Sequence, residues 1–320
     1  MVALHLRHQR YITALLSSTT ILLLLYFQNS LLVFTYSSHS FISKKVQCDC
    51  SICVTDRENS NWFSERYDPN ISVRSTAPTV CYMQTSPVVD GKKELQNNYI
   101  ALTYLILLSF STTRTPVQIA AETCAVVGNS GNLLGSKYGP LIDFHDFVIR
   151  MNKGPTEGYE KDVGSKTTHR IVYPESAMDL DNSTHLVLLP IKILDIQWLI
   201  SAFTTNHITQ HDNRMSGFIS VICLQVMILH PGFIRYVYDN WTRGQGLYPS
   251  TGFLTLIFAL HICDEVSVFG FGATSDGIWH HYFEETLTSY ESGVHAGIFE
   301  NETIYRLQQE NKILMYKGWT

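Results

Sequence analysis

The stretch CAVVGNSGNLLGSKYG, residues 124–139, decides the fold class. It opens with an apolar, β-prone run that ends at Gly128, where a buried parallel strand of an α/β sheet normally turns toward a helix. That turn is a usual place for a ligand. Glycine lets backbone N–H groups approach a phosphate closely, and Asn129 and Ser130 add side-chain donors and acceptors for a sugar or a base.

The glycine spacing leaves a second reading open. GNSGNLLG has neither the G-x-G-x-x-G pattern of dinucleotide folds nor the Gly-Lys-Ser/Thr ending of a P-loop. An ordinary strand-to-loop turn therefore remains an alternative to a ligand-binding loop.

The rest of the chain alternates between the two kinds of secondary structure. Strand-like runs occur at residues 124–127, 147–151, 170–173, 186–190, 226–229 and 266–269. Helix-like runs lie between several of them or after the last, at residues 193–201, 252–261 and 303–309. This alternation predicts a single Rossmann-like α/β domain with a doubly wound sheet.

Length and composition indicate how large a core this domain can bury. With 320 residues and 45% hydrophobic content, the chain can bury the core of one large domain with appendages. The formal net charge of −5 gives no sign of a nucleic-acid-binding protein.

The N-terminus carries a long apolar run, residues 11–36, preceded by Arg7, His8 and Arg10. A bilayer-spanning helix needs about 20 residues. The run exceeds the usual apolar core of a cleaved signal peptide, which is the alternative. We expect a cytoplasmic tail at 1–10, a transmembrane signal anchor at 11–36, a short stem at 37–47 and one domain at 48–320, in which 76–123 is divergent. Lys44 and Lys45 after the span nearly balance the basic residues before it, so the charge bias alone does not decide which end of the span is cytoplasmic.

Glycosylation sequons and cysteines supply those observations. All four sequons follow the span, which suits a lumenal C-terminal part; their acceptors are Asn70, Asn182, Asn240 and Asn301. Seven cysteines suit disulfides in an oxidising compartment, although an odd number cannot all pair within one chain. A metal knuckle at Cys48, Cys50 and Cys53 is the alternative, but it lacks a second half with zinc spacing.

A second glycine-rich stretch is YPSTGFLTLIFALHICDEVSVFGFG, residues 248–272. Ser250, Thr251 and Gly252 are good N-cap and anion-binding residues before an apolar helix. A plain helix cap is the alternative for this segment. The strand that follows ends in Gly270 and Gly272, so two glycine-rich edges and one helix start predict a nucleotide-sugar cleft.

Histidines cluster near the C-terminus, in WHHYFEE at residues 279–285 and GVHAGIFE at 293–300. Adjacent histidines lack the i, i+4 geometry of a helical zinc site, so a metal is the minority interpretation. Transfer of a sugar to a hydroxyl needs a general base with a pKa near neutral, which histidine supplies. A second, protonated imidazole would stabilise a departing phosphate.

These stretches, in this order, resemble the four conserved motifs of animal sialyltransferases. Residues 124–176 resemble the large motif, 248–272 the small motif, 280–283 the third, and His295 with Glu300 the very small one. The residues of these motifs are most similar to those of the enzymes that place sialic acid on the 3-OH of galactose in Galβ1,3GalNAc. The resemblance implies a variant GT-A sialyltransferase fold and CMP-sialic acid as the donor, with no cofactor.

The resemblance also implies residue roles. His295 would be the base that deprotonates the galactose hydroxyl, and His281 would stabilise the phosphate of CMP, in a single inverting displacement. The remaining implied contacts to CMP-sialic acid and the acceptor are Asn129, Ser130, Asn152, Tyr248, Ser250, Thr251, Gly252 and Gly272.

Covalent structure and location follow from the same resemblance. It implies disulfides Cys124–Cys263 and Cys48–Cys53, and it leaves Cys50 without its usual partner because Ala121 occupies that position. It further implies a single-pass type II protein of the Golgi membrane, with glycoprotein or glycolipid acceptors. Two alternatives stay open: a metal-dependent glycosyltransferase that uses Asp179 and Asp181, and an inactive lumenal glycan-binding paralogue.

Overall fold

The computed structural model describes residues 54, 60–75, 121–204, 226–274, 280–284 and 294–318. The predicted anchor and stem, the cysteines at 48, 50 and 53, and most of the divergent segment lie outside these ranges. Within them, no helix combines the length and apolar character needed to cross a bilayer.

The core of the described chain is an eight-stranded sheet with the order β1-β6-β5-β4-β3-β2-β7-β8. All neighbouring strands are parallel except β1, which pairs antiparallel with β6. The strands are β1 (Arg74–Ser75), β2 (Ala121–Val127), β3 (Phe147–Met151), β4 (His169–Val172), β5 (His185–Leu188), β6 (Val226–Leu229), β7 (Cys263–Phe269) and β8 (Leu314–Tyr316).

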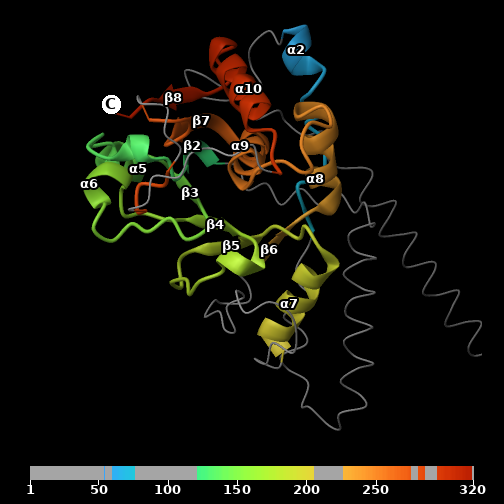
Figure 1. The fold of residues 1–320 in the computed structure, drawn as a ribbon, viewed down its shortest axis with the longest axis horizontal. Helices are drawn as coiled ribbons and strands as arrows, with labels where there is room; N and C mark the ends of the chain where they lie inside the picture. The colour runs from blue at the N-terminus through green and yellow to red at the C-terminus, as the bar shows by residue number, and fades with distance from the viewer. Residues whose placement is uncertain are drawn as a thin grey trace, which may run out of the picture. The chain divides into compact units, whose positions relative to one another are not determined.

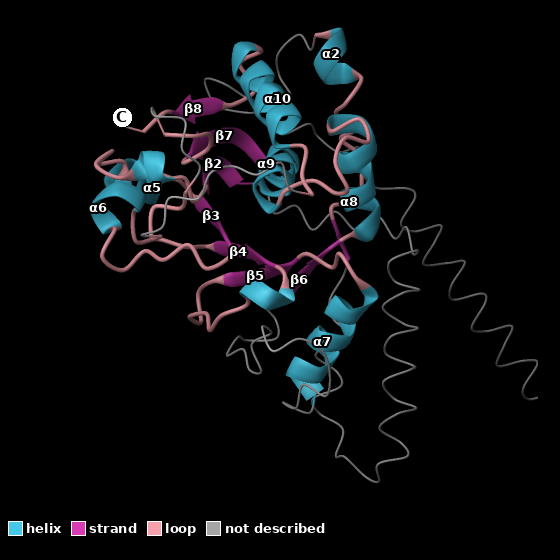
Figure 2. Cartoon of the chain, viewed as in Figure 1, coloured by secondary structure: helices cyan, strands magenta, loops and turns pink. Residues whose placement is uncertain are grey.

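Helices cover both faces of the sheet (Figures 1 and 2). The longer ones are α7 (Ile193–Thr204), α9 (Thr251–Ile262) and α10 (Gly297–Gln309). The short ones are α2 (Asn61–Ser64), α5 (Gly139–Phe144), α6 (Glu160–Val163) and α8 (Pro231–Tyr236), with 3-10 turns η2 (Gly131–Leu133) and η3 (Pro174–Ser176) and a π-helical turn η5 (Val237–Trp241).

The central strand β2 shows how the two faces are filled. Cys124 and Val126 belong to the core cluster that includes the buried residues of α9, whereas Ala125 and Val127 belong to a second cluster. This second cluster contains Ile142 of α5 and Val163 of α6. Successive side chains of a strand point to opposite faces, so a strand apolar at every position is covered on both sides. In Figure 1, α9 lies on one side of the sheet and α5 and α6 lie on the other.

The strand order reverses between β2 and β7. From β2 the chain moves outward through β3, β4, β5 and β6, then returns to place β7 on the other side of β2. Ligands of doubly wound sheets bind at the carboxyl ends of the strands at such a switch point. The doubly wound α/β prediction is therefore confirmed, and both predicted glycine-rich edges, which follow β2 and β7, lie at the switch.

A disulfide joins the same two strands. Cys124 bridges Cys263 with a Cα–Cα distance of 6.1 Å, which confirms the predicted pairing. Ala121 begins β2 directly opposite Cys263 in the strand register. The resemblance implies a cysteine at position 121 as the disulfide partner of Cys50. Because this residue is alanine, Cys50 cannot form that disulfide.

Several boundaries differ from the sequence-based expectation. The predicted helix at 303–309 begins six residues earlier, at Gly297. Its first turn was not predicted because the segment GIFENE, residues 297–302, opens with glycine and shows no clear helical periodicity. The helices α5, α6 and α8 were not predicted, since four to six residues are too few to show a helical repeat.

Candidate active site

A cleft of about 780 Å³ opens at the carboxyl ends of β2, β3, β4 and β7. The starts of α9 and α10 form its opposite wall. Ten residues predicted from the sequence to bind substrate or act in catalysis all line this one cleft: Asn129, Ser130, Asn152, Tyr248, Ser250, Thr251, Gly252, Gly272, His281 and His295.

The two glycine-rich edges pack against each other at the floor of the cleft. The amide of Gly128 donates to the carbonyl oxygen of Phe269 at 2.7 Å, and a Cβ on Gly128 would lie 2.3 Å from the carbonyl oxygen of Gly270. Gly270 has φ +68, where a side chain is strained. These glycines are therefore required by close backbone contact.

The histidine segment is joined to the first glycine-rich loop by main-chain hydrogen bonds. Ser130 and His281 form an antiparallel bridge, and the amide of Tyr282 donates to the carbonyl oxygen of Asn129 at 2.9 Å. A Cβ on Gly131 would lie 2.3 Å from Nε2 of His280, so the ring packs directly on that glycine. This pairing brings His281 to the switch point although it lies far along the chain.

Asn152 follows β3 in a left-handed conformation, with φ +52. Its side-chain carbonyl oxygen accepts a hydrogen bond from the hydroxyl of Ser176 at 2.9 Å, and its backbone carbonyl accepts from the buried guanidinium of Arg170 at 2.8 Å. Asparagine tolerates this backbone conformation better than most residues. The strained turn therefore holds the amide nitrogen of Asn152 at the cleft.

The start of α9 is held by a buried carboxylate. Ser250 is the N-cap, and its hydroxyl oxygen accepts from the amide of Phe253 at 3.1 Å. The amide of Ser250 donates in turn to Glu300 of α10 at 2.7 Å. Burial raises the pKa of Glu300, whereas its hydrogen bonds from Ser250 act in the opposite direction. Glu300 thus fixes the helix start, whose dipole favours a negatively charged group in the cleft.

His295 lies at the other wall, immediately before α10. Its Nδ1 is 3.0 Å from the backbone carbonyl oxygen of Tyr248, and the two rings meet edge to face at 4.8 Å. A carbonyl oxygen only accepts, so Nδ1 carries the proton in this contact and Nε2 of the neutral ring keeps its lone pair. The arrangement presents a base to the cleft.

His281 makes a different kind of contact. Its Nδ1 lies 2.7 Å from Oε1 of Glu284, and its ring stacks on Phe283 at 5.2 Å. The hydrogen bond from His281 lowers the pKa of Glu284. The carboxylate accepts from Nδ1, and Nε2, on the opposite side of the ring, points away from Glu284. This geometry suits a partner for a phosphate.

The sequence model of glycosyltransferase family 29, the sialyltransferases, matches residues 77–312 of the chain. The chain belongs to this family. It is 41% identical over 281 residues to CMP-N-acetylneuraminate-beta-galactosamide-alpha-2,3-sialyltransferase 1 of Homo sapiens, which covers 85% of this chain and 83% of that protein. It is 42% identical over 282 residues to the type 2 enzyme of Mus musculus, covering 85% and 80%.

A solved structure of the same family has the same fold. A crystal structure of a mammalian sialyltransferase in complex with Gal-beta-1-3GalNAc-ortho-nitrophenol superposes with a TM-score of 0.69 at 41% identity. The match covers 85% of this chain and 100% of that one. The resemblance inferred from the four motifs is therefore confirmed, and the chain is a family 29 glycosyltransferase.

Asp179 and Asp181, the alternative metal-binding pair, are not among the residues that line the family 29 cleft. Oδ1 of Asp181 accepts from the backbone and hydroxyl of Ser183 and from the hydroxyl of Thr184. These hydrogen bonds lower the pKa of Asp181. The carboxylate is thus used in a surface turn, which gives the alternative no support from the site geometry.

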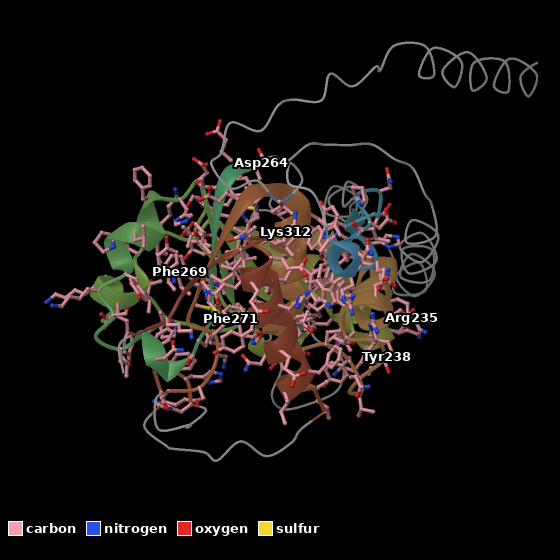
Figure 3. The ribbon with its side chains drawn as sticks, turned by 90° about the horizontal axis from the view of Figure 1, so that it is seen from above. Arg235, Tyr238, Asp264, Phe269, Phe271 and Lys312 are labelled. Carbon is pink, nitrogen blue, oxygen red and sulfur yellow. A yellow bond between two sulfur atoms is a disulfide. The ribbon has the colours of Figure 1, made fainter. Side chains whose placement is uncertain are left out.

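Several residues that line the cleft were not predicted from the sequence. Tyr173 and Glu175 follow β4, Ile191 to Asp195 follow β5, and Phe271 follows β7; all but residues 193 and 194 line the cleft. Figure 3 labels Phe269, the last residue of β7, and Phe271. The available signal was the position of polar residues directly after apolar strands, at the edge where parallel strands carry ligands.

The four sequon asparagines occupy different surroundings. Asn70 and Asn182 are exposed, whereas Asn240 and Asn301 are half-buried. Asn301 lies on α10 and lines the cleft, and Thr303 of the same sequon is buried, donating to the carbonyl oxygen of Phe299. A glycan on Asn301 would project from the cleft wall.

Proposed function

We propose that this chain transfers sialic acid from CMP-sialic acid to the 3-OH of galactose in Galβ1,3GalNAc of glycoproteins or glycolipids. The observation that carries the proposal is the convergence of all ten predicted residues on one cleft, with a histidine base at one wall and a second histidine paired to a carboxylate. The names of the relatives, which are α2,3-sialyltransferases, support the same reaction.

In this mechanism, Nε2 of His295 accepts the proton from the galactose 3-OH as its oxygen attacks the anomeric carbon of the sialyl group. The new glycosidic bond forms as the bond from that carbon to the CMP phosphate oxygen breaks, so the configuration inverts. The leaving phosphate gains charge in the transition state, and His281 donates a hydrogen bond to it. The start of α9 adds a helix dipole of the favourable sign.

The donor would lie with its nucleotide across the switch point. Asn129, Ser130 and Gly272 would contact CMP from the two glycine-rich loops, and Asn152 would contact it from β3. The side-chain amides of Asn129 and Asn152 would supply donors for the phosphate and the ribose. No cofactor is needed in this scheme, because histidine rather than a metal supports the phosphate.

The experiment is transfer of labelled sialic acid from CMP-sialic acid to Galβ1,3GalNAc, with Galβ1,4GlcNAc as a matched acceptor. We expect the first acceptor to be preferred and the product to be cleaved by an α2,3-specific sialidase. A purified lumenal domain that transfers to neither acceptor would contradict the proposal and would favour an inactive glycan-binding protein.

We also propose that the chain is a single-pass type II protein of the Golgi membrane, with residues 1–10 cytoplasmic, 11–36 spanning the bilayer, 37–47 a stem and 48–320 lumenal. The apolar run, the downstream sequons and the Cys124–Cys263 disulfide support this. Digestion of the expressed protein with an N-glycosidase should increase its mobility, chiefly through Asn70 and Asn182. Unchanged mobility would contradict a lumenal domain.

A further inference from the structure

The arm of the cleft beside β4 and β5 contains three charged side chains that the mechanism above does not use. Nζ of Lys192 lies 2.7 Å from Oε1 of Glu175 and 4.0 Å from Oδ1 of Asp195. All three residues line the cleft. Lys192 is half exposed, whereas Asp195 is fully buried.

Part of this arrangement is explained by helix capping. Asp195 is in the first turn of α7, and its Oδ2 accepts from the backbone amides of Ile191 and Lys192, each at 2.8 Å. Such a reach back to the preceding amides stabilises a helix start. Capping uses only Oδ2, so it does not account for the other oxygen.

Two carboxylate oxygens in this arm have no hydrogen-bond donor among the residues that the structure describes. They are the buried Oδ1 of Asp195 and Oε2 of Glu175. Leaving a buried acceptor unsatisfied destabilises the folded chain, and more so when the group is charged. Burial also raises the pKa of Asp195. Two unsatisfied acceptors at a cleft wall indicate a ligand that brings hydrogen-bond donors.

The position in the sheet shows which part of a substrate reaches this arm. Glu175 follows β4 and Lys192 follows β5, which are two and three strands away from β2. At about 4.8 Å between strands, the arm is roughly 10–14 Å from the glycine-rich loop after β2. If the donor nucleotide lies at that loop, as in the proposed function, with its phosphate near Asn152 after β3, its sugar would extend toward β4 and β5.

The charges show which chemistry fits. Two carboxylates and one ammonium leave an excess negative charge, which disfavours the carboxylate of a sialyl group. Vicinal hydroxyls donate to carboxylate oxygens and accept from an ammonium. The matching group on the donor is its three-carbon polyol side chain.

We propose that Glu175, Lys192 and Asp195 form a subsite for the hydroxyl-bearing side chain, carbons 7 to 9, of the sialyl group of the donor. This inference rests on the proposed function. The subsite makes the chain discriminate among donor sugars by the length and hydroxylation of that side chain.

The test compares CMP-sialic acid with a CMP donor whose sugar lacks carbons 8 and 9. We expect wild-type kcat/KM to be about 10- to 100-fold lower for the truncated donor, the range that a lost hydrogen bond to a charged group gives. In Lys192→Met and Glu175→Gln, the intact donor should lose this advantage, so the ratio of the two kcat/KM values falls toward one. Asp195 is left unchanged because it also caps α7.

Lys161→Met, an exposed lysine of α6 that does not line the cleft, is the matched control and should keep the wild-type ratio. Variants that lower kcat/KM equally for both donors would overturn the proposal, because that is the result of a structural role. If Lys192→Met and Glu175→Gln changed only the acceptor KM, the three residues would bind hydroxyls of the acceptor sugar. That result would also overturn the proposal.

Calorimetric titration of the wild type with CMP, the intact donor and the truncated donor separates this inference from the proposed function. If no acceptor is sialylated, the proposed function fails, but tighter binding of the intact donor, lost in Lys192→Met, still supports the subsite. Equal binding of intact and truncated donors by an active enzyme overturns the subsite alone.

Discussion

Nδ1 of His295 lies 3.0 Å from the backbone carbonyl oxygen of Tyr248. This contact fixes the tautomer of the ring, because only a protonated Nδ1 can donate to a carbonyl. It connects the N-terminus of α10 to the segment that leads into α9, so the proposed base is positioned by the same turn that caps the helix. A backbone hydrogen bond therefore sets the orientation of Nε2.

The first prediction concerns His295 as the base. His295→Ala should lower kcat by about 10²- to 10⁴-fold, because proton transfer is lost while donor contacts at the other wall remain. Initial rates with CMP-sialic acid and Galβ1,3GalNAc measure kcat, and calorimetric titration with CMP measures donor binding. Near-normal turnover in His295→Ala would contradict the mechanism.

The second prediction concerns His281. His281→Ala should raise the donor KM and lower kcat together, since a phosphate partner acts in the ground state and in the transition state. Glu284→Gln removes the carboxylate from Nδ1 and should show a weaker form of the same double effect. A His281→Ala enzyme that loses kcat with unchanged CMP affinity would instead place this histidine in proton transfer.

Much of this architecture was predictable because the strands are strongly patterned. β3 and β6 have the predicted bounds and are bordered by polar residues; β6 is apolar and fully buried, and β3 is buried after Phe147 and apolar except for Arg150. The position of Gly128 and Gly270 after their strands likewise predicted which edge of the sheet carries the site. Parallel strands place their carboxyl ends together, so sequence position alone brings these glycines to one edge.

Other parts of the site depend on tertiary contacts that no local pattern encodes. The bridge between Ser130 and His281 joins loops separated by 150 residues, and Glu300 holds Ser250 across two helices. Lys192 and Glu175 meet only because β4 and β5 are neighbours. Side-chain pairs of this kind follow from strand order, which the sequence pattern left undetermined.

The third prediction concerns metal independence. Wild-type transfer should persist in EDTA, and Asp179→Asn with Asp181→Asn should change kcat/KM by no more than a few-fold, since neither residue lines the cleft. Rates before and after chelation, with Mn²⁺ added back, check this. Loss of activity to EDTA that Mn²⁺ restores would favour the metal-dependent alternative.

The fourth prediction concerns the disulfide. Cys124 and Cys263 are both buried and lie 139 residues apart in the sequence. In the chain-entropy model, closing a loop of this length stabilises by about 5 kcal/mol. Cys124→Ala with Cys263→Ala should lower the free energy of unfolding by an amount of this order, measured by denaturant titration of the lumenal domain.

Reductant provides the control for that measurement. It should destabilise the wild type and leave the double variant nearly unchanged, apart from any effect on other disulfides. Peptide mapping without reductant should recover the Cys124–Cys263 pair. Recovery of both as free thiols would contradict the bridge.

The last prediction concerns the dependence of stability on pH and rests on the buried His169, which stacks on the half-buried His185 at the opposite edge of the sheet. His169 of β4 is 2% exposed and stacks on His185 of β5 at 5.0 Å. Burial, aided by the neighbouring His185, lowers the pKa of His169 to about 3. Its Nδ1 is within 2.9 Å of the hydroxyl oxygen of Thr168, and Phe147 of β3 packs against its ring.

Between pH 3 and the ordinary histidine value near 6.5, the unfolded chain binds a proton at this position and the folded chain does not. The unfolded state therefore binds more protons, and stability falls as pH falls through this window. From pH 7.5 to 5.5 the loss from His169 should be about 1.4 kcal/mol. His169→Phe, which keeps an aromatic ring on Phe147 and His185, should remove that part of the pH dependence. Free energies of unfolding by denaturant at both pH values measure the slope, and equal slopes in the wild type and the variant would show that His169 is protonated in the folded sheet.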